Sequence, residues 1–397
     1  MVGSMLAAAV APSGLNVVVL ESKLPAAFDS DSPYDLRVSA LSIAAENMLT
    51  VTGAWQHILE MRSAAFQRMK VWDGEAGGST TFDSTDVGHT HLGTIVENRV
   101  IQLALHRALE NSPSVSIRAP SSVADIDVAS DHVRVFLDDG EVLTTKLLVG
   151  ADGARSTVRQ LSGIKSVTKN YPQHALVASV NTRSSQQDIT WQRFVPSGPQ
   201  ALLPLQGPRA SMVWYHSSDE IERLLALDDA SFLDEMQQAF PLEADELLSV
   251  AGRASFPLVC AHAEHYVQSR LALVGDAAHS VHPLAGQGVN MGLLDAATLA
   301  DSLKRAHESG RDVGSLSVLR PYERVRRGEN AAMIKILDGF YEAFKPQPAV
   351  VKTVRSGLLD SAQRLQPVRK LLMQHAMGIR GDLPDLALNS NPATNPL

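Results

Sequence analysis

The segment that most constrains the fold of this chain runs from Leu271 to Gly292. It opens with the apolar run Leu271–Val274, which has the length of a buried strand, and this run ends at Gly275 and Asp276. Ligands of open α/β sheets bind outside the carboxyl ends of the strands. The pattern therefore predicts a strand that carries the Asp276 carboxylate to a ligand-binding edge.

The residues after this strand exclude an ordinary continuous helix. Pro283 lacks a backbone donor, and Gly286 and Gly288, on either side of Gln287, allow conformations that other residues avoid. We expect a loop with free backbone N–H groups, followed by a helix that begins near Val289. A flat ligand can approach such a backbone closely.

Two further segments have the same form, an apolar run followed by a turn or an acid. Near the start of the chain the run Val17–Leu20 leads to Glu21, which indicates a buried strand with a terminal carboxylate. In the middle, Leu147–Gly150 precedes Asp152 and Gly153 at a sharp turn into a helix. Together the three strands predict a Rossmann-like parallel sheet.

These segments resemble the flavin-dependent aromatic hydroxylases of the para-hydroxybenzoate hydroxylase type. The phrase that begins Gly275-Asp276-Ala-Ala-His is similar, more specifically, to the ubiquinone-biosynthesis hydroxylases of the 2-octaprenylphenol hydroxylase type. Val96-Glu-Asn98 and the neighbourhood of Tyr322 add to the likeness, which spans nearly the whole chain. The resemblance implies an FAD-binding parallel sheet and an antiparallel sheet that covers the flavin and its substrate.

The same resemblance implies where FAD is bound. In the family the Gly-Asp carboxylate holds the ribitol chain, the glycine-rich loop lies against the flavin ring, and the Asp-Gly turn serves both FAD and the pyridine nucleotide. The cofactor-binding residues that carry over are Gly3, Glu21, Arg37, Gln102, Val123, Asp152, Gly153, Gly275, Asp276, Pro283, Gly286, Gln287, Gly288, Val289 and Asn290.

Several of these positions have a second interpretation. Arg37 can neutralise the pyrophosphate or act as a surface ion-pair partner, and Gln102 can contact the flavin phosphates or lie on a helix surface. The contact of Val123 with adenine depends on the resemblance alone. Arg155 and Arg159 are four residues apart, so both can meet an NAD(P)H phosphate or point into solvent.

The beginning of the chain departs from the family pattern. Met1–Ala11 has the composition of a helix of small residues with no strand before it, and of the Gly-x-Gly-x-x-Gly motif only the third glycine remains, as Gly3. We expect the first strand of the βαβ unit to be missing, through a late start codon or a truncated gene. A signal peptide fits poorly because no basic segment precedes Met1. The missing loop would give N–H groups to the pyrophosphate, so FAD should bind weakly.

The fold class expected is α/β, or α+β overall, in two lobes followed by a helical tail. The expected parts are a discontinuous FAD-binding domain (residues 1–70, 96–165 and 265–320), an antiparallel substrate domain (71–95 and 166–264), and a C-terminal helical region (321–397). A group of apolar residues in the substrate domain can line a pocket or pack in its core. They are Leu202, Leu203, Leu205, Met212 and Trp214.

Composition excludes several classes of protein. The formal charge of -8 argues against non-specific nucleic-acid binding, and no apolar run approaches the roughly 20 residues that cross a bilayer. The single cysteine, Cys260, excludes an internal disulfide and suits a reducing compartment. His279 and His282 lack further ligands at a suitable spacing, so we predict no metal. The prediction is a cytoplasmic protein, with peripheral contact at the inner membrane left open.

The reaction expected is the one the resemblance implies. In the family, NAD(P)H reduces FAD, O2 adds to form a C4a-hydroperoxide, and an electron-rich phenol takes up the distal oxygen. We predict hydroxylation of a polyprenylated phenol in ubiquinone synthesis, with O2, NAD(P)H or another reductant, and partners in a quinone-synthesis complex. Two alternatives stay open: a hydroxylase of a small soluble phenol, and a non-catalytic scaffold subunit. No side chain stands out as a base, so the catalytic residue is unassigned.

Overall fold

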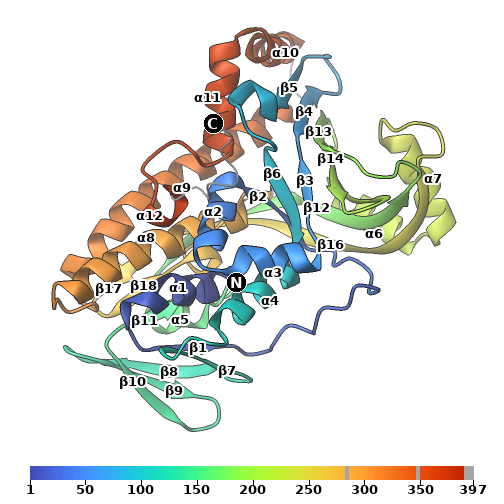
Figure 1. The fold of residues 1–397 in the computed structure, drawn as a ribbon. Helices are drawn as coiled ribbons and strands as arrows, with labels where there is room; N and C mark the ends of the chain where they lie inside the picture. Colours follow the sequence, from blue (N-terminus) through green and yellow to red (C-terminus); the bar gives the residue numbers. More distant parts are fainter. Residues whose placement is uncertain (282–285, 346–348, 389–397) are drawn as a thin grey trace.

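The computed structural model describes residues 1–281, 286–345 and 349–388 (Figure 1). Helices and strands are mixed along the described chain, which confirms the predicted class. The helices are Val2–Val10 (α1), Ile43–Val51 (α2), Ala54–Met61 (α3), Asn98–Leu109 (α4), Thr157–Leu161 (α5), Ser218–Ala226 (α6), Asp229–Ala239 (α7), Gly288–Glu308 (α8), Leu316–Phe344 (α9), Ala349–Arg364 (α10), Gln366–Ala376 (α11) and Asp385–Leu388 (α12).

The three apolar runs singled out in the sequence form parallel strand pairs, but in two separate sheets. β1 (Val17–Leu20) pairs in parallel with β7 (Val115–Arg118). β11 (Leu148–Gly150) pairs in parallel with β18 (Leu271–Leu273), whose other neighbour is the short antiparallel β17 (Val267–Gln268). Within the described ranges no strand joins the two sheets, so β1 and β11 are both edge strands.

These two sheets differ in burial. Each residue of β18 is 0% exposed, whereas Val18 in the middle of β1 is 45% exposed. The expectation that both strands would be buried is therefore wrong for β1. A parallel strand is buried when its two faces are covered and its edges are paired, and β1 has a strand partner on one side only.

A larger sheet forms the second lobe. Its strands are Arg68–Asp73 (β4), Ser79–Asp83 (β5), Ser166–Thr182 (β12), Ile189–Val195 (β13), Gly198–Leu205 (β14), Arg209–Ser217 (β15), Leu247–Ala263 (β16) and His279–Ser280 (β19). Among the described residues their order is β19-β16-β12-β15-β14-β13-β4-β5. Neighbours are antiparallel except β13 and β4, which are parallel. The sheet is thus mixed, whereas the sequence had suggested a purely antiparallel one.

The two faces of this sheet have different partners, as the alternation of side chains along a strand requires. Leu202, Met212 and Trp214 pack with residues of α6 and α7 in one core cluster. Leu203 and Leu205 face the other way and pack in a cluster that includes residues of α11. The first three are therefore core residues of the outer layer.

The chain after α8 is helical, as expected. In Figure 1, α9 runs beside α8, and α10 and α11 lie at the top next to β4 and β5. A buried ion pair between Arg355 of α10 and Asp73 of β4 fastens this region to the large sheet. No helix in the described part of the chain combines the length and apolar character needed to cross a membrane.

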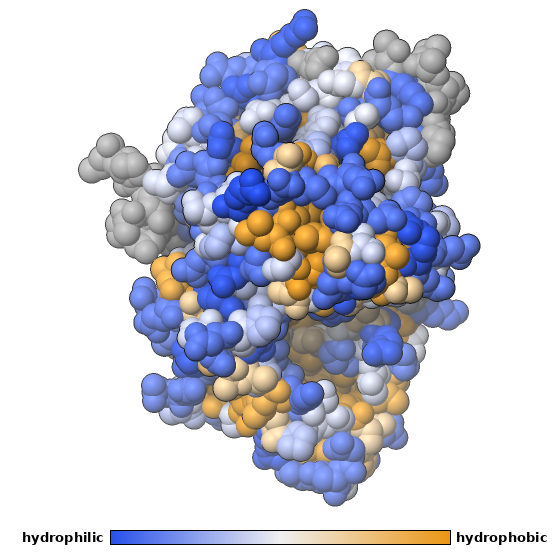
Figure 2. All heavy atoms as spheres, turned by 90° about the vertical axis from the view of Figure 1, so that its right-hand side faces the viewer, coloured by the Kyte–Doolittle hydropathy of each residue, from blue (hydrophilic) through white to orange (hydrophobic). Residues whose placement is uncertain are grey.

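One side of the molecule is visibly hollowed. Figure 2 shows the face at the right of Figure 1, where apolar side chains gather near the middle among polar ones. Below them the surface recedes before the lower end, which carries the sheet of Val123–Val128 (β8), Val133–Leu137 (β9) and Val142–Thr145 (β10).

Candidate functional site

The Gly-Asp turn directly follows β18. The turn Gly275–Ala277 (η3) begins at a residue with φ of +60°, in the left-handed region that favours glycine. A Cβ atom added to Gly275 would lie 3.0 Å from a methyl carbon of Val2 in α1. Both conformation and space therefore require glycine here, and the turn sends the next side chain, Asp276, away from the core.

Asp276 is the acid that the Gly-Asp turn presents at the surface. The residue is exposed to solvent, yet protein atoms crowd it at short range, and this desolvation raises the pKa of its carboxyl group. His279 and Arg37 act in the opposite direction, which places Arg37 close to it. Within the described ranges no hydrogen bond of the protein involves the Asp276 carboxylate. An accessible, desolvated and unpaired carboxylate is suited to accept hydrogen bonds from hydroxyl groups of a ligand.

The glycine-rich loop is fastened to β2 (Val38–Ser42). Asn290, in the first turn of α8, accepts a hydrogen bond from the Ser42 backbone N–H at 3.0 Å and donates one to the Ala40 carbonyl at 2.8 Å. Gly286 has a φ of +62°, and a Cβ there would lie 3.5 Å from the Ala40 nitrogen. Asn290 therefore positions the start of α8 beside β2.

Three further residues of this loop lie at the start of α8. Gln287 is the N-cap of α8, and Gly288 and Val289 are its first residues. The positive end of the helix dipole thus lies in this loop. Pro283 and His282 lie outside the described residues.

A second group of predicted residues meets at the end of β1. The Gln102 side-chain amide on α4 donates a hydrogen bond to the Glu21 carboxylate at 3.3 Å. His106, one turn further along α4, is close enough for Glu21 to oppose the lowering of its pKa by burial. The Ser121 N–H donates to the Glu21 carbonyl at 2.9 Å, which brings the start of β8, at Val123, to the same place. Sequence reasoning missed His106, although its spacing from Gln102 could have indicated it.

The Asp-Gly turn after β11 is used mainly for internal contacts. The Asp152 carboxylate accepts hydrogen bonds from the Ser156 hydroxyl and from the Val158 N–H, so it caps the start of α5, while Gly153 adopts φ of +80°. Arg159 donates to the carbonyl of Ala277 at 2.7 Å. Arg159 therefore ties the Asp-Gly turn to the Gly-Asp turn, a role that neither interpretation of the sequence had included.

Gly3 lies where α1 crosses the Asp-Gly turn. A Cβ atom on Gly3 would be 3.2 Å from the Cβ of Ala151, closer than most such contacts. Close packing of helix on strand is the purpose of the third glycine in a dinucleotide-binding motif. Gly3 therefore allows α1 to pack closely on the Asp-Gly turn, and its place in a cofactor site stays a prediction.

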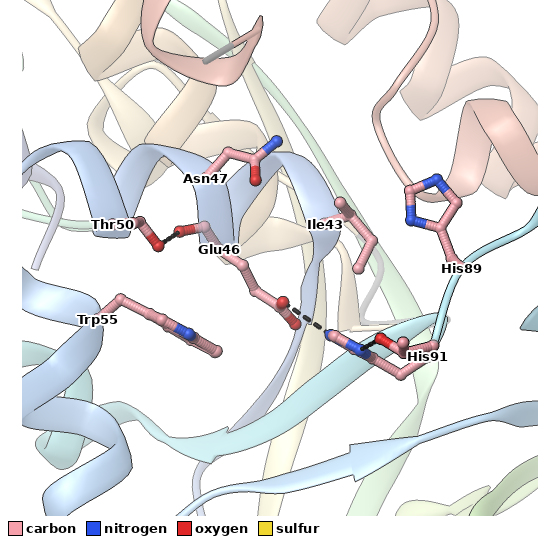
Figure 3. A pocket seen from close by; sticks show the side chains of 8 residues that line it. Ile43, Glu46, Asn47, Thr50, Trp55, His89 and His91 are labelled. Atoms are coloured by element: carbon pink, nitrogen blue, oxygen red, sulfur yellow. Dashed lines mark hydrogen bonds and ion pairs between the residues drawn. The ribbon is translucent and has the colours of Figure 1, made fainter. Parts of the chain in front are cut away.

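A separate small pocket lies beside α2 (Figure 3). It is lined by Ile43, Glu46, Asn47, Thr50, Trp55, His89, Thr90 and His91. Burial works against a charge on His91, but its 2.8 Å hydrogen bond to Glu46 and the charge of Glu46 outweigh burial and raise its pKa. None of the predicted cofactor residues lines this pocket, so it is distinct from the Gly-Asp turn.

Comparison with known proteins places the chain among flavoproteins. The model of the FAD binding domain family matches residues 1–335. The chain is similar to 3-demethoxyubiquinol 3-hydroxylase of Escherichia coli, at 38% identity over 379 residues and 96% of both chains. It is 37% identical over 380 residues to ubiquinone hydroxylase UbiL of Rhodospirillum rubrum, over 95% of this chain and 87% of the relative. In fold it is similar to p-nitrophenol 4-monooxygenase of Pseudomonas putida, with a TM-score of 0.76, 20% identity and 95% of both chains covered.

Proposed function

The chain belongs to the FAD-dependent hydroxylases of ubiquinone biosynthesis, and from this premise we propose that it hydroxylates the ring of a polyprenylated phenol, using O2 and electrons from NAD(P)H or another reductant. Membership confirms the family, the enzyme class and the cofactor that the sequence resemblance implied. The substrate, the reductant and the individual residues are the proposal.

The unpaired carboxylate of Asp276 is the single observation that carries the cofactor assignment. We assign the Asp276 carboxylate to the ribitol hydroxyl groups of FAD, since it is accessible, desolvated and without a protein partner in the described residues. Arg37, which lies over the Phe256 ring at 4.9 Å, would face the phosphates or the flavin. When bound, FAD supplies the electron transfer and oxygen activation that no side chain can provide.

The other proposed contacts fall into two sets. The loop and helix start at Gly286, Gln287, Gly288, Val289 and Asn290 would lie against the flavin ring, where the helix dipole favours negative charge. Glu21, with Gln102 beside it, would accept the adenosine ribose hydroxyls.

The inner face of the large sheet supports an apolar substrate. Val71 of β4 packs in two core clusters at once, one with Leu203 and Ile43 and the other with Val213. An apolar wall of this kind can bury a prenyl chain and keep water away from the reacting ring. A small polar phenol would gain little from it.

We also propose peripheral contact with a membrane, where polyprenylated molecules reside. Ile336 and Phe340 of α9 and Leu371 and Leu372 of α11 are apolar and between 43% and 47% exposed. Flotation of the protein with lipid vesicles, compared with a variant carrying serine at these four positions, tests this contact.

The experiment that tests the activity is turnover under labelled oxygen. Purified protein with FAD, a reductant and ¹⁸O2 should place one labelled atom on a prenylated phenol, detected by mass spectrometry. Oxidation of a short soluble phenol with no turnover of the prenylated one would favour the soluble-phenol alternative.

A non-catalytic scaffold is the second candidate, and the divided parallel sheet favours it. A folded protein that stays colourless with FAD and does not replace its relative in a strain lacking that hydroxylase, yet co-purifies with other quinone-synthesis proteins, would support the scaffold and contradict the enzyme. Complementation of strains blocked at each hydroxylation step would identify the ring position.

A further inference from the structure

One buried carboxylate connects both ends of the Gly-Asp turn. Asp295 of α8 is 0% exposed, and its Oδ2 accepts hydrogen bonds from the Gly275 N–H at 3.0 Å and from Nε2 of His279 at 2.5 Å. Gly275 is the first residue of the turn, and His279 lies two residues after its last residue, Ala277. A single oxygen atom therefore fixes the segment that carries Asp276.

The second oxygen of Asp295 is held by α9. Its Oδ1 accepts hydrogen bonds from Nε of Arg326 at 2.8 Å and from the Asn330 amide at 3.0 Å. Burial alone would raise the pKa of Asp295, but His279 and Arg326 outweigh burial and lower it to about 2. Asp295 is therefore ionised throughout the physiological range, and both of its oxygens are used.

A third side chain of α9 reaches the strand before the turn. The Tyr322 hydroxyl donates a hydrogen bond of 2.6 Å to the carbonyl of Leu273, the last residue of β18. Tyr322, Arg326 and Asn330 are spaced by four residues and so lie on one face of the helix. Each is at most 2% exposed. One stripe of α9 thus contacts the strand end and, through Asp295, the turn.

The polar character of this stripe requires an explanation other than stability. A buried ion pair is expensive to desolvate, and well-packed apolar side chains of similar size often stabilise a fold as well or better. What the ion pair adds is a fixed direction for each hydrogen bond. The groups fixed here are the backbone and side chain on either side of Asp276.

We propose that Asp295 and the stripe Tyr322–Arg326–Asn330 are positioning residues that hold the Gly-Asp turn so that Asp276 points at the ribitol chain of FAD. This rests on the proposed function in one respect, the assignment of Asp276 to FAD. It makes α9 part of the cofactor site, although the domain boundary we propose after residue 320 falls inside that helix.

The test is a double-mutant cycle in FAD affinity. We expect Asp276→Asn, which weakens a direct charged contact, to raise the Kd for FAD on the order of 10- to 100-fold. Asp295→Asn should raise it by about 10-fold or more, as loss of an orienting partner does at other sites. Because Asp295 acts through Asp276, the double variant should bind FAD no more weakly than Asp276→Asn alone.

A matched control separates positioning from general loss of stability. Asp73 pairs with Arg355 at 2.6 Å in an equally buried ion pair that links β4 to α10. Asp73→Asn should lower the melting temperature as Asp295→Asn does, and it should leave the Kd for FAD within about 2-fold of the wild-type value. If Asp295→Asn does not fold, Tyr322→Phe provides the same test, since it removes one hydroxyl and should raise the Kd about 3- to 10-fold.

The possible failures are distinguishable. Should Asp276→Asn bind FAD as tightly as the wild type, the assignment of Asp276, and with it the proposed cofactor site, is wrong. The positioning role alone is wrong if Asp276→Asn weakens binding while Asp295→Asn and Tyr322→Phe do not. It is also wrong if the two aspartate substitutions have additive effects.

Discussion

Two strand ends in this protein carry an acid that we propose contacts FAD, and the two acids lie in different surroundings. Asp276 follows β18, which is completely buried, and its turn is held by Asp295, Arg159 and the stripe of α9. Glu21 follows β1, whose middle residue Val18 is 45% exposed, and its carboxylate meets Gln102 at 3.3 Å. The proposed flavin end of the site is therefore fixed by several buried side chains, whereas the proposed adenosine end follows a partly exposed strand.

This difference indicates which half of the proposed site contributes more to the affinity for FAD. Preorganised groups contribute to affinity because little further ordering is needed when the ligand arrives. The turn at Asp276 meets that condition through several buried contacts, whereas the end of β1 follows a strand that is partly exposed. Changes in the Asp276 half should therefore have larger consequences than matched changes in the β1 half.

The largest difference is expected for a buried and an exposed arginine. Arg326→Met leaves the Asp295 carboxylate buried without its guanidinium partner and should lower the free energy of unfolding by about 3–5 kcal/mol. Arg118→Met in β7 removes an ion pair to Glu141 in which both side chains are exposed. This substitution should change the free energy of unfolding by less than about 1 kcal/mol. Urea denaturation measures both. Equal losses would contradict the contrast between the two halves.

Two glycines sharpen the same comparison. Gly275 and Gly14 both have positive φ, but a Cβ on Gly275 would also press on Val2, whereas Gly14, just before β1, has open space around it. Gly275→Ala should cost about 2–3 kcal/mol of stability, and Gly14→Ala about 1 kcal/mol from backbone strain alone. Thermal unfolding of the two variants would show this order. A reversed order would mean that the turn is not tightly packed.

The smallest expected effect concerns pH. Because desolvation raises the pKa of Asp276, its ionised form opposes folding, so its contribution to stability improves as pH falls through that raised pKa. FAD affinity should change in the opposite sense, since the ribitol hydroxyls need the ionised form as acceptor. We expect Asp276→Asn to stabilise the FAD-free chain at neutral pH and to flatten the pH dependence of FAD binding. A destabilised FAD-free variant would contradict this.

Much of the site could be predicted because it depends on local patterns. An apolar run followed by Gly275-Asp276, and a glycine-rich loop before a helix, specify strand, turn and helix start without knowledge of the rest of the fold. Glu21 at the end of β1 and Gln102 on α4 were each predicted from a local pattern, and the structure places them within hydrogen-bond distance of each other.

The contacts that sequence reasoning missed join distant elements through side chains. Arg159 reaches the carbonyl of Ala277, and Arg326 reaches Asp295, and neither partner can be identified from spacing along the chain. One signal was present: Asp295 is a lone acid in the apolar segment Met291–Ala297, and a charge on the buried face of a helix needs a partner. The exposure of β1 was missed because an apolar run does not reveal whether both edges of its strand are paired.

The most direct test of the rigid flavin end is calorimetric titration of FAD into the folded chain, with Asp276→Asn and Glu21→Gln in parallel. We predict saturable binding that Asp276→Asn weakens several-fold more than Glu21→Gln does. A folded chain that takes up no FAD, or one whose affinity falls more with Glu21→Gln, would contradict it.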